Sequence, residues 1–262
     1  MSEETEIFES LEQTRARACI EWVFEWVFWR VNKDYDPAAG HGQAVVGVLA
    51  YTYASDLFNR LSAAGRYRLP AGAPNDRGID LLQEGIPVEA FNSMRELDHG
   101  SLHRSDFAGS PGWAVGDTRW ILQSMPFGEI DKINWRDKSE TKQRAGRQPY
   151  SYGNPGLFDL EDYGLDFQLE DDFTGTTFIV AHAFNGETGE YEVYFGRSRS
   201  AEQPGTGPWH WRRLIASGGF GPTNPTFDEG GPTLPGAPPV PIAPDANVRL
   251  RPSPPATGTG QD

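Results

Sequence analysis

The first strong pattern along the chain is helical. Between Ile7 and Val31 there is no Gly or Pro, and apolar residues recur at steps of three, four and seven. The stretch from Ile20 to Trp29 is apolar on nearly every side and is interrupted only by Glu21 and Glu25. A helix of this kind is usually buried in a core or in a subunit interface. We therefore expect its tryptophans to contact a partner chain: Trp22, Trp26 and Trp29.

A second apolar stripe predicts a helix from Gly42 to Ala64, and Gly65 is a natural C-terminal stop. Small residues along this segment would let another helix approach closely. The simplest arrangement is an antiparallel pair with the first helix. A short helix is expected near Val88 to Leu97.

Further along, the pattern changes from a helical period to that of β-strands. Residues 119–123 are a short strand candidate, and residues 209–215 can add another. The runs 177–184 and 191–195 are rich in β-branched and aromatic residues and flank a Gly-containing loop, which indicates a hairpin. Because helices and strands are segregated, we predict an α+β fold. In it, an N-terminal helical pair packs on a small antiparallel β-sheet of about three to five strands.

The composition changes sharply after Ser217. Residues 218–262 hold 11 of the 21 prolines and few large apolar side chains, so they cannot bury enough surface to fold alone. We predict a single α+β domain over residues 1–217, helical over 1–97 and β-rich over 118–217. An extended Pro/Gly-rich C-terminal tail follows it, over residues 218–262.

The prolines of this tail have a period of three residues. A polyproline II helix has three residues per turn, so prolines at this spacing line up along one edge. They begin at Pro232, and we expect the following four to bind a partner with an aromatic-lined groove: Pro235, Pro238, Pro241 and Pro244. The alternative is a stiff spacer or a strap over the body of the same chain.

Charge and cysteine content exclude several classes of protein. The formal net charge of -14 argues against nucleic-acid binding, which needs clustered Lys and Arg. No apolar run reaches the ~18 residues that a membrane span needs. The acidic N-terminal stretch lacks the basic region of a signal peptide, so we expect a cytoplasmic or particle-associated protein without a membrane partner. The single cysteine excludes an intramolecular disulfide and a multi-thiolate zinc site.

Charges of opposite sign are segregated in the middle of the chain. A basic block spans residues 132–147, and acidic residues without any base span 159–172. The basic block contains Glu140-Thr141-Lys142, half of a metal-dependent nuclease pattern that would need Asp131 on a preceding strand. We interpret the surroundings of this motif as a charged loop.

One candidate for catalysis joins Cys19 with His182. A thiol hydrolase needs a cysteine near a helix N-terminus and a histidine within hydrogen-bond reach. Cys19 with the apolar residues after it, followed later by a strand bearing His182, resembles NlpC/P60-type cell-wall amidases over these two short stretches. The resemblance implies Cys19 as nucleophile and His182 as base, and His210 is the candidate third member. The alternative is a core cysteine inside an apolar helix, because residues 13–18 read as continuous helix.

A metal site is a further alternative. His99 and His103 have the spacing that lets two imidazoles share one ion on a helix. Asp98 and Asp106 could complete the coordination. Gly100 weakens such a helix and stands where a metalloprotease would have its glutamate, so surface or capping histidines are the competing interpretation.

From these features we expect a non-catalytic interaction or assembly protein that self-associates or binds a protein partner. The apolar aromatic helix, the segregated charges and the periodic prolines each suit contact with another chain. The Cys–His hydrolase and the metal-binding protein remain open as alternatives. The sequence points to no particular cofactor.

Overall fold

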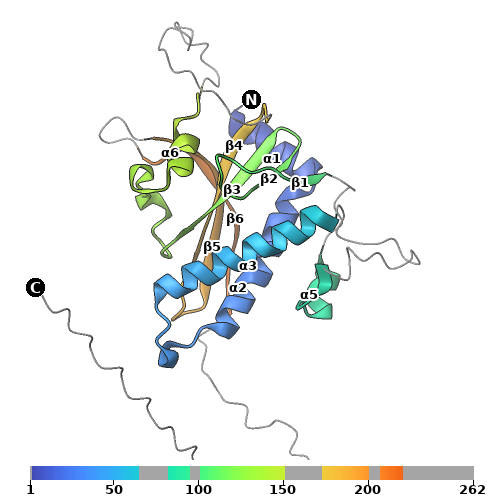
Figure 1. Ribbon diagram of the computed structural model, residues 1–262, viewed down its shortest axis with the longest axis vertical. Coiled ribbons are helices and arrows are strands. Elements are labelled where there is room, and N and C mark those ends of the chain that lie inside the picture. The colour runs from blue at the N-terminus through green and yellow to red at the C-terminus, as the bar shows by residue number, and fades with distance from the viewer. Residues whose placement is uncertain (1, 65–81, 95–100, 151–172, 201–206, 221–262) are drawn as a thin grey trace, which may run out of the picture. The chain divides into compact units, whose positions relative to one another are not determined.

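The structure is a computed structural model that describes residues 2–64, 82–94, 101–150, 173–200 and 207–220 (Figure 1). The chain divides into two units, residues 1–224 and 225–262, and every described residue belongs to the first. The proline period lies outside the described residues. The last strand runs to Gly219, two residues past the predicted domain boundary.

A mixed sheet of six strands forms the centre of the described part (Figure 1). Its strands lie in sequence order, and every neighbouring pair is antiparallel except β3 and β4, which are parallel. The predicted α+β class is confirmed, although the sheet is larger than expected and includes this parallel pair. The strands are β1 (Leu102–Arg104), β2 (Gly112–Val115), β3 (Thr118–Met125), β4 (Thr176–Phe184), β5 (Glu190–Ser198) and β6 (Trp209–Gly219).

The predicted first helix is in fact two helices. The first ends at Gln13 and is capped by Thr14, whose N–H and hydroxyl both donate to the Ser10 carbonyl. Arg15 then takes a left-handed conformation with φ 58°. Neither residue is a Gly or Pro, so the apolar pattern contains no signal for this break. The helices are α1 (Glu3–Gln13), α2 (Ala16–Asp34), α3 (Gln43–Ala64), α5 (Val88–Ser93) and α6 (Glu140–Arg147), with 3-10 turns at Pro37–Ala39, Ile130–Lys132 and Trp135–Asp137.

Helices α2 and α3 form the expected antiparallel pair. Phe24, in the middle of α2, packs against Phe58 in the C-terminal half of α3. At the C-terminal end of α2, Asp34 accepts hydrogen bonds from the Tyr53 hydroxyl, near the middle of α3, at 2.8 Å and from Arg30 Nε at 2.7 Å. Burial, and then the Asp34 carboxylate, raises the pKa of Tyr53.

The sheet is covered on both faces (Figure 1). Helices α1, α2 and α3 pack on one face, where alternate residues of β4 such as Phe178 and Phe184 join their core. The other face carries α6 and the 3-10 turns at Ile130–Lys132 and Trp135–Asp137, with Ile179 and Ala181 of β4 in that smaller core. Burial on both faces explains why β4 is mostly apolar rather than alternating between apolar and polar residues.

None of the helices in the described ranges combines the length and apolarity that crossing a membrane requires.

Candidate functional site

One face of α2 forms a wall of a groove of about 340 Å³. The residues that α2 contributes follow the spacing i, i+3, i+4, i+7, which places them on one side of a helix. They are Trp22, Glu25, Trp26 and Trp29, and the remaining lining comes from Pro87, Ala90, Ser93 and Phe220. We call this the α2 groove. The three tryptophans that the sequence predicts to contact a partner chain therefore line one groove.

The walls of the α2 groove are held by specific contacts. Trp22 is buried, and its indole Nε1 donates to the Ala90 carbonyl at 2.8 Å, which holds α5 against α2. Phe220 stacks on the ring of Tyr191 with centroids 5.6 Å apart. Segments distant in the sequence thus meet around the helix. Trp26 and Trp29 are half-buried, so part of each indole faces the groove.

The polar groups of the α2 groove are few. The Glu25 side chain is exposed, and it raises the pKa of Tyr191, although burial has the larger effect on that phenol. Lys33 Nζ lies 5.3 Å from the centroid of the Trp29 ring. A concave apolar surface with a few polar groups at its edge is typical of a ligand-binding site.

The structure does not bring Cys19 and His182 together as a hydrogen-bonded pair. Cys19 is buried in the first turn of α2, so the helix break at Arg15 gives it the helix-terminal position that a continuous helix would have denied it. His182, however, packs against Phe24 and Phe28, with ring centroids 4.8 Å and 6.1 Å away. Neither of its ring nitrogens has a hydrogen-bond partner.

The environment of His182 is that of a core residue. Its side chain is fully buried, and burial, with a smaller effect from Lys142, lowers its pKa to about 3. His210, the candidate third member, stacks on Tyr150 beside Ser198 of β5. His182 pairs with Val193 of β5, whereas His210 lies beside Ser198, five residues further along the same strand. These two positions on β5 are about 16 Å apart.

The candidate metal ligands are only partly described. Asp98 and His99 lie outside the described residues. His103 is exposed on strand β1, where it pairs with Ala114, and does not lie on a helix. Within the described ranges, no group of three or more His, Cys, Asp or Glu side chains could hold a metal ion.

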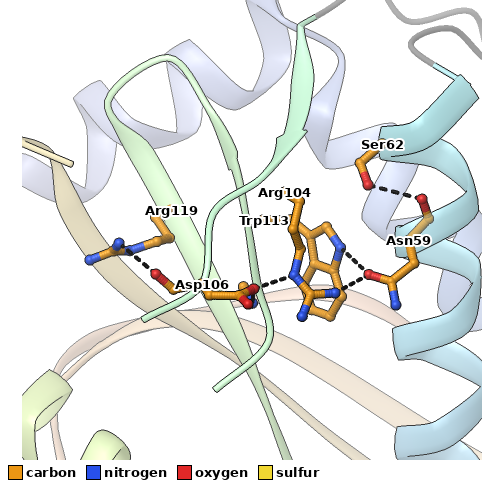
Figure 2. Close-up of polar contacts among 7 residues, drawn as sticks. Asn59, Ser62, Arg104, Asp106, Trp113 and Arg119 are labelled. Atoms are coloured by element: carbon orange, nitrogen blue, oxygen red, sulfur yellow. Dashed lines mark hydrogen bonds and ion pairs between the residues drawn. The ribbon is translucent and has the colours of Figure 1, made fainter. Parts of the chain in front are cut away.

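Asp106 belongs instead to a polar network between the sheet and α3 (Figure 2). Its carboxylate accepts from Arg104 Nε, and the same guanidinium donates to Oδ1 of Asn59 on α3. Trp113 Nε1 donates to that oxygen at 3.2 Å, and Arg119 Nη1 donates to the Asp106 carbonyl at 3.2 Å. These contacts attach the short strands β1 and β2 to α3 and occupy the carboxylate that a metal would need.

The residues of the nuclease motif each contact a different partner and do not converge on one site. The predicted charged loop is helix α6, and Glu140 at its first turn is exposed and pairs with Arg144. Asp131 pairs with Arg212, which lowers the pKa of the aspartate. Lys142 is buried and donates to the Leu122 carbonyl on β3.

The contact made by Lys142 closes an open edge of the sheet. Strand β2 pairs with β3 only as far as Ile121, so the Leu122 carbonyl has no strand partner on that side. Burial, with a smaller effect from Lys138, lowers the pKa of Lys142 to about 8. Lysines often block edge strands in this way, and nothing in the sequence singled out Lys142 as buried.

The chain matches no protein-family profile, no curated protein and no solved structure.

Two features named from the sequence lie outside the described residues. They are the four prolines expected to bind a partner and the acidic block at 159–172. Conversely, the sequence pattern did not point to two arginines, Arg197 on β5 and Arg199 just after it, of which Arg197 is 3% exposed. The only sequence feature that could have indicated these arginines is the position of Arg197 shortly after the predicted strand 191–195, in which most residues are apolar or aromatic.

Proposed function

We propose that the protein is a non-catalytic assembly protein in which the α2 groove of one copy binds the proline-rich segment 232–244 of another copy. The observation that carries this proposal is the lining of the groove. Three tryptophans project from one face of α2, and Phe220 adds a fourth aromatic side chain. Aromatic-lined grooves bind polyproline II segments, because such segments are already extended and lose little entropy on binding.

The dimensions of the two parts agree. Along α2, the rise from Trp22 to Trp29 is about 10 Å. A polyproline II helix advances about 9 Å for every three residues. Two successive prolines of the period therefore span the length of the tryptophan face.

The charges of the two parts are also compatible. Segment 232–244 contains no charged residue, although the chain as a whole has a net charge of -14. Its approach to the groove, with exposed Glu25 at the edge, is therefore not opposed by charge repulsion. A contact between the groove of one copy and the tail of the next is heterologous, so it extends into rings or filaments.

The test is a complementation experiment on the full-length chain, followed by sedimentation velocity. Trp29→Ala impairs the groove and leaves the tail intact, whereas the triple substitution Pro235→Ala, Pro238→Ala and Pro241→Ala impairs the tail and leaves the groove intact. We expect the wild-type chain to associate as its concentration rises and each variant alone to be monomeric. An equimolar mixture should form heterodimers through the one intact groove and the one intact tail.

Tyr51→Ala is the matched control, because Tyr51 is a half-buried aromatic residue on α3 outside the α2 groove. This variant should associate like the wild type. If each variant alone still associates like the wild type, another surface mediates assembly, and if the mixture stays monomeric, the intact groove does not bind the intact tail. A wild-type chain that is monomeric at all concentrations, with its tail bound to its own groove, would contradict assembly as the function.

A further inference from the structure

Partnerless polar atoms gather where β5 ends. Arg197 is 3% exposed, and its Nε and Nη1 have no hydrogen-bond partner, while Nη2 donates to the Pro149 carbonyl at 2.7 Å. The Nε of Arg199 is likewise buried without a partner. The two arginines are alternate residues of one extended segment, so their side chains leave it on the same side. Buried N–H groups are almost always paired, so these atoms are donors available to a ligand.

The positive charge of these arginines is also not balanced by an ion pair. The Nη2 of Arg199 donates to a backbone carbonyl, that of Trp209, at 2.6 Å. The guanidinium of Arg197 lies 5.6 Å from the centroid of the Phe178 ring. Burial lowers the pKa of Arg197, and Glu3 and then Tyr150 oppose this effect without cancelling it. Charged side chains in protein interiors are normally paired, and neither guanidinium has a carboxylate partner among the described residues.

Tyr150 and His210 complete the cluster. Their rings stack with centroids 4.0 Å apart and an interplanar angle of 16°. His210 lies where the β5–β6 register shifts, between the partners of Arg197 and Ser198, and it is the extra residue of a β-bulge. Bulges often redirect a side chain next to a functional site.

The positive charges of the two arginines influence the pKa values of both His210 and Tyr150. Burial, then Arg199 and Arg197, lower the pKa of His210 to about 4. The imidazole is therefore neutral at pH 7 and adds a hydrogen-bonding group without adding charge. Burial raises the pKa of Tyr150, so its hydroxyl keeps its proton.

We propose that Arg197, Arg199, Tyr150 and His210 form a binding site for a phosphate group. Two guanidinium groups without carboxylate partners match the charge of a phosphate dianion better than that of a single carboxylate. Guanidinium N–H groups are the usual protein donors to phosphate oxygens. The phenol and the imidazole supply neutral hydrogen-bonding groups beside them. This site is distinct from the α2 groove, so it does not depend on the proposed function.

The test is thermal unfolding of the full-length protein in buffer without oxyanions, titrated with inorganic phosphate. Sodium chloride at matched ionic strength is the reference. A ligand that binds only the folded state raises the melting temperature in step with its concentration. We expect phosphate to raise it above the chloride reference, and sodium acetate to have no such effect.

Variants identify the residues responsible. Arg197→Met and Arg199→Gln should each weaken the apparent phosphate affinity about tenfold or more, because each removes charged donors. Without phosphate, Arg197→Met should be at least as stable as the wild type, because it removes a buried charge that lacks an ion-pair partner. The matched control is Arg213→Met, which removes an exposed arginine of β6 and should keep the full phosphate response.

Three results would overturn the proposal. Phosphate could stabilise the protein no more than chloride at equal ionic strength. The response could persist unchanged in both Arg197→Met and Arg199→Gln, which would place phosphate elsewhere. Acetate could act as strongly as phosphate, which would assign the site to carboxylates instead.

Discussion

His182 makes the stability of the protein depend on pH in a way that can be calculated. Its imidazole is fully buried against Phe24 and Phe28, without a hydrogen-bond partner, and its pKa is about 3 in the folded chain. An unfolded chain has the ordinary histidine pKa of about 6.5. Because the folded-state pKa is depressed, protonation favours the unfolded state. Stability is therefore fully present above about pH 6.5 and is lost as the pH falls from there towards 3.

The perturbation is His182→Leu, which replaces the imidazole with an apolar side chain of similar size. Between pH 7.5 and 5.5, protonation of His182 in the unfolded chain costs the wild type about 1.4 kcal/mol of unfolding free energy. The variant should lose about 1.4 kcal/mol less than the wild type over this interval. It should also gain about 1–3 kcal/mol at both pH values, because it removes two buried polar atoms without partners.

The assay is urea unfolding of both proteins at pH 7.5 and 5.5, followed by tryptophan fluorescence. Comparing the two proteins cancels the titration of the carboxylates, which both chains share. Val180→Ala is the control: it lies on the same strand and the same face, and should lower the unfolding free energy equally at both pH values. If His182→Leu kept the wild-type pH dependence, the imidazole would not be buried in the apolar environment described above.

Three further substitutions test other contacts. Lys142→Met removes an amine whose pKa burial lowers to about 8. The wild type should gain about 2–3 kcal/mol of unfolding free energy between pH 8 and 10, relative to the variant, because the unfolded chain holds this proton more tightly; urea unfolding at both pH values measures it. Trp22→Phe removes the hydrogen bond to Ala90, so amide hydrogen exchange over residues 88–93 should accelerate about tenfold with little change elsewhere. Gly112→Ala places a Cβ 2.3 Å from the Ser105 carbonyl oxygen, so the variant should lose about 1–3 kcal/mol in urea unfolding; unchanged stability would contradict this packing of β2.

The sequence predicted the long elements because their apolar periods extend over many residues. The paired helices, the hairpin of β4 and β5, and strand β6 all follow from periods of 3.6 or 2. Strands β1 and β2 have only three and four residues, too few to establish a period. The break at Arg15 was missed because a left-handed arginine between two helices carries no compositional signal.

The parallel pairing of β3 with β4 depended on tertiary structure. An apolar strand that is buried on both faces has the same pattern in a parallel or an antiparallel pair. The hydrophobic pattern therefore cannot tell which neighbour the strand has or in which direction that neighbour runs. The long connection between the two strands, which includes α6, permits the parallel arrangement.

The features of the candidate sites also fall into those that the sequence predicts and those that depend on tertiary structure. The sequence alone determined that Trp22, Trp26 and Trp29 share one helix face, because their spacing is local. Only the folded chain placed α5 and Phe220 beside them to make a groove, since those segments are distant in the sequence. The burial of Lys142 and Arg197 likewise depends on the tertiary structure. The sequence pattern indicates on which face of an element a side chain lies, but the exposure of that side chain depends on which other segments pack over it.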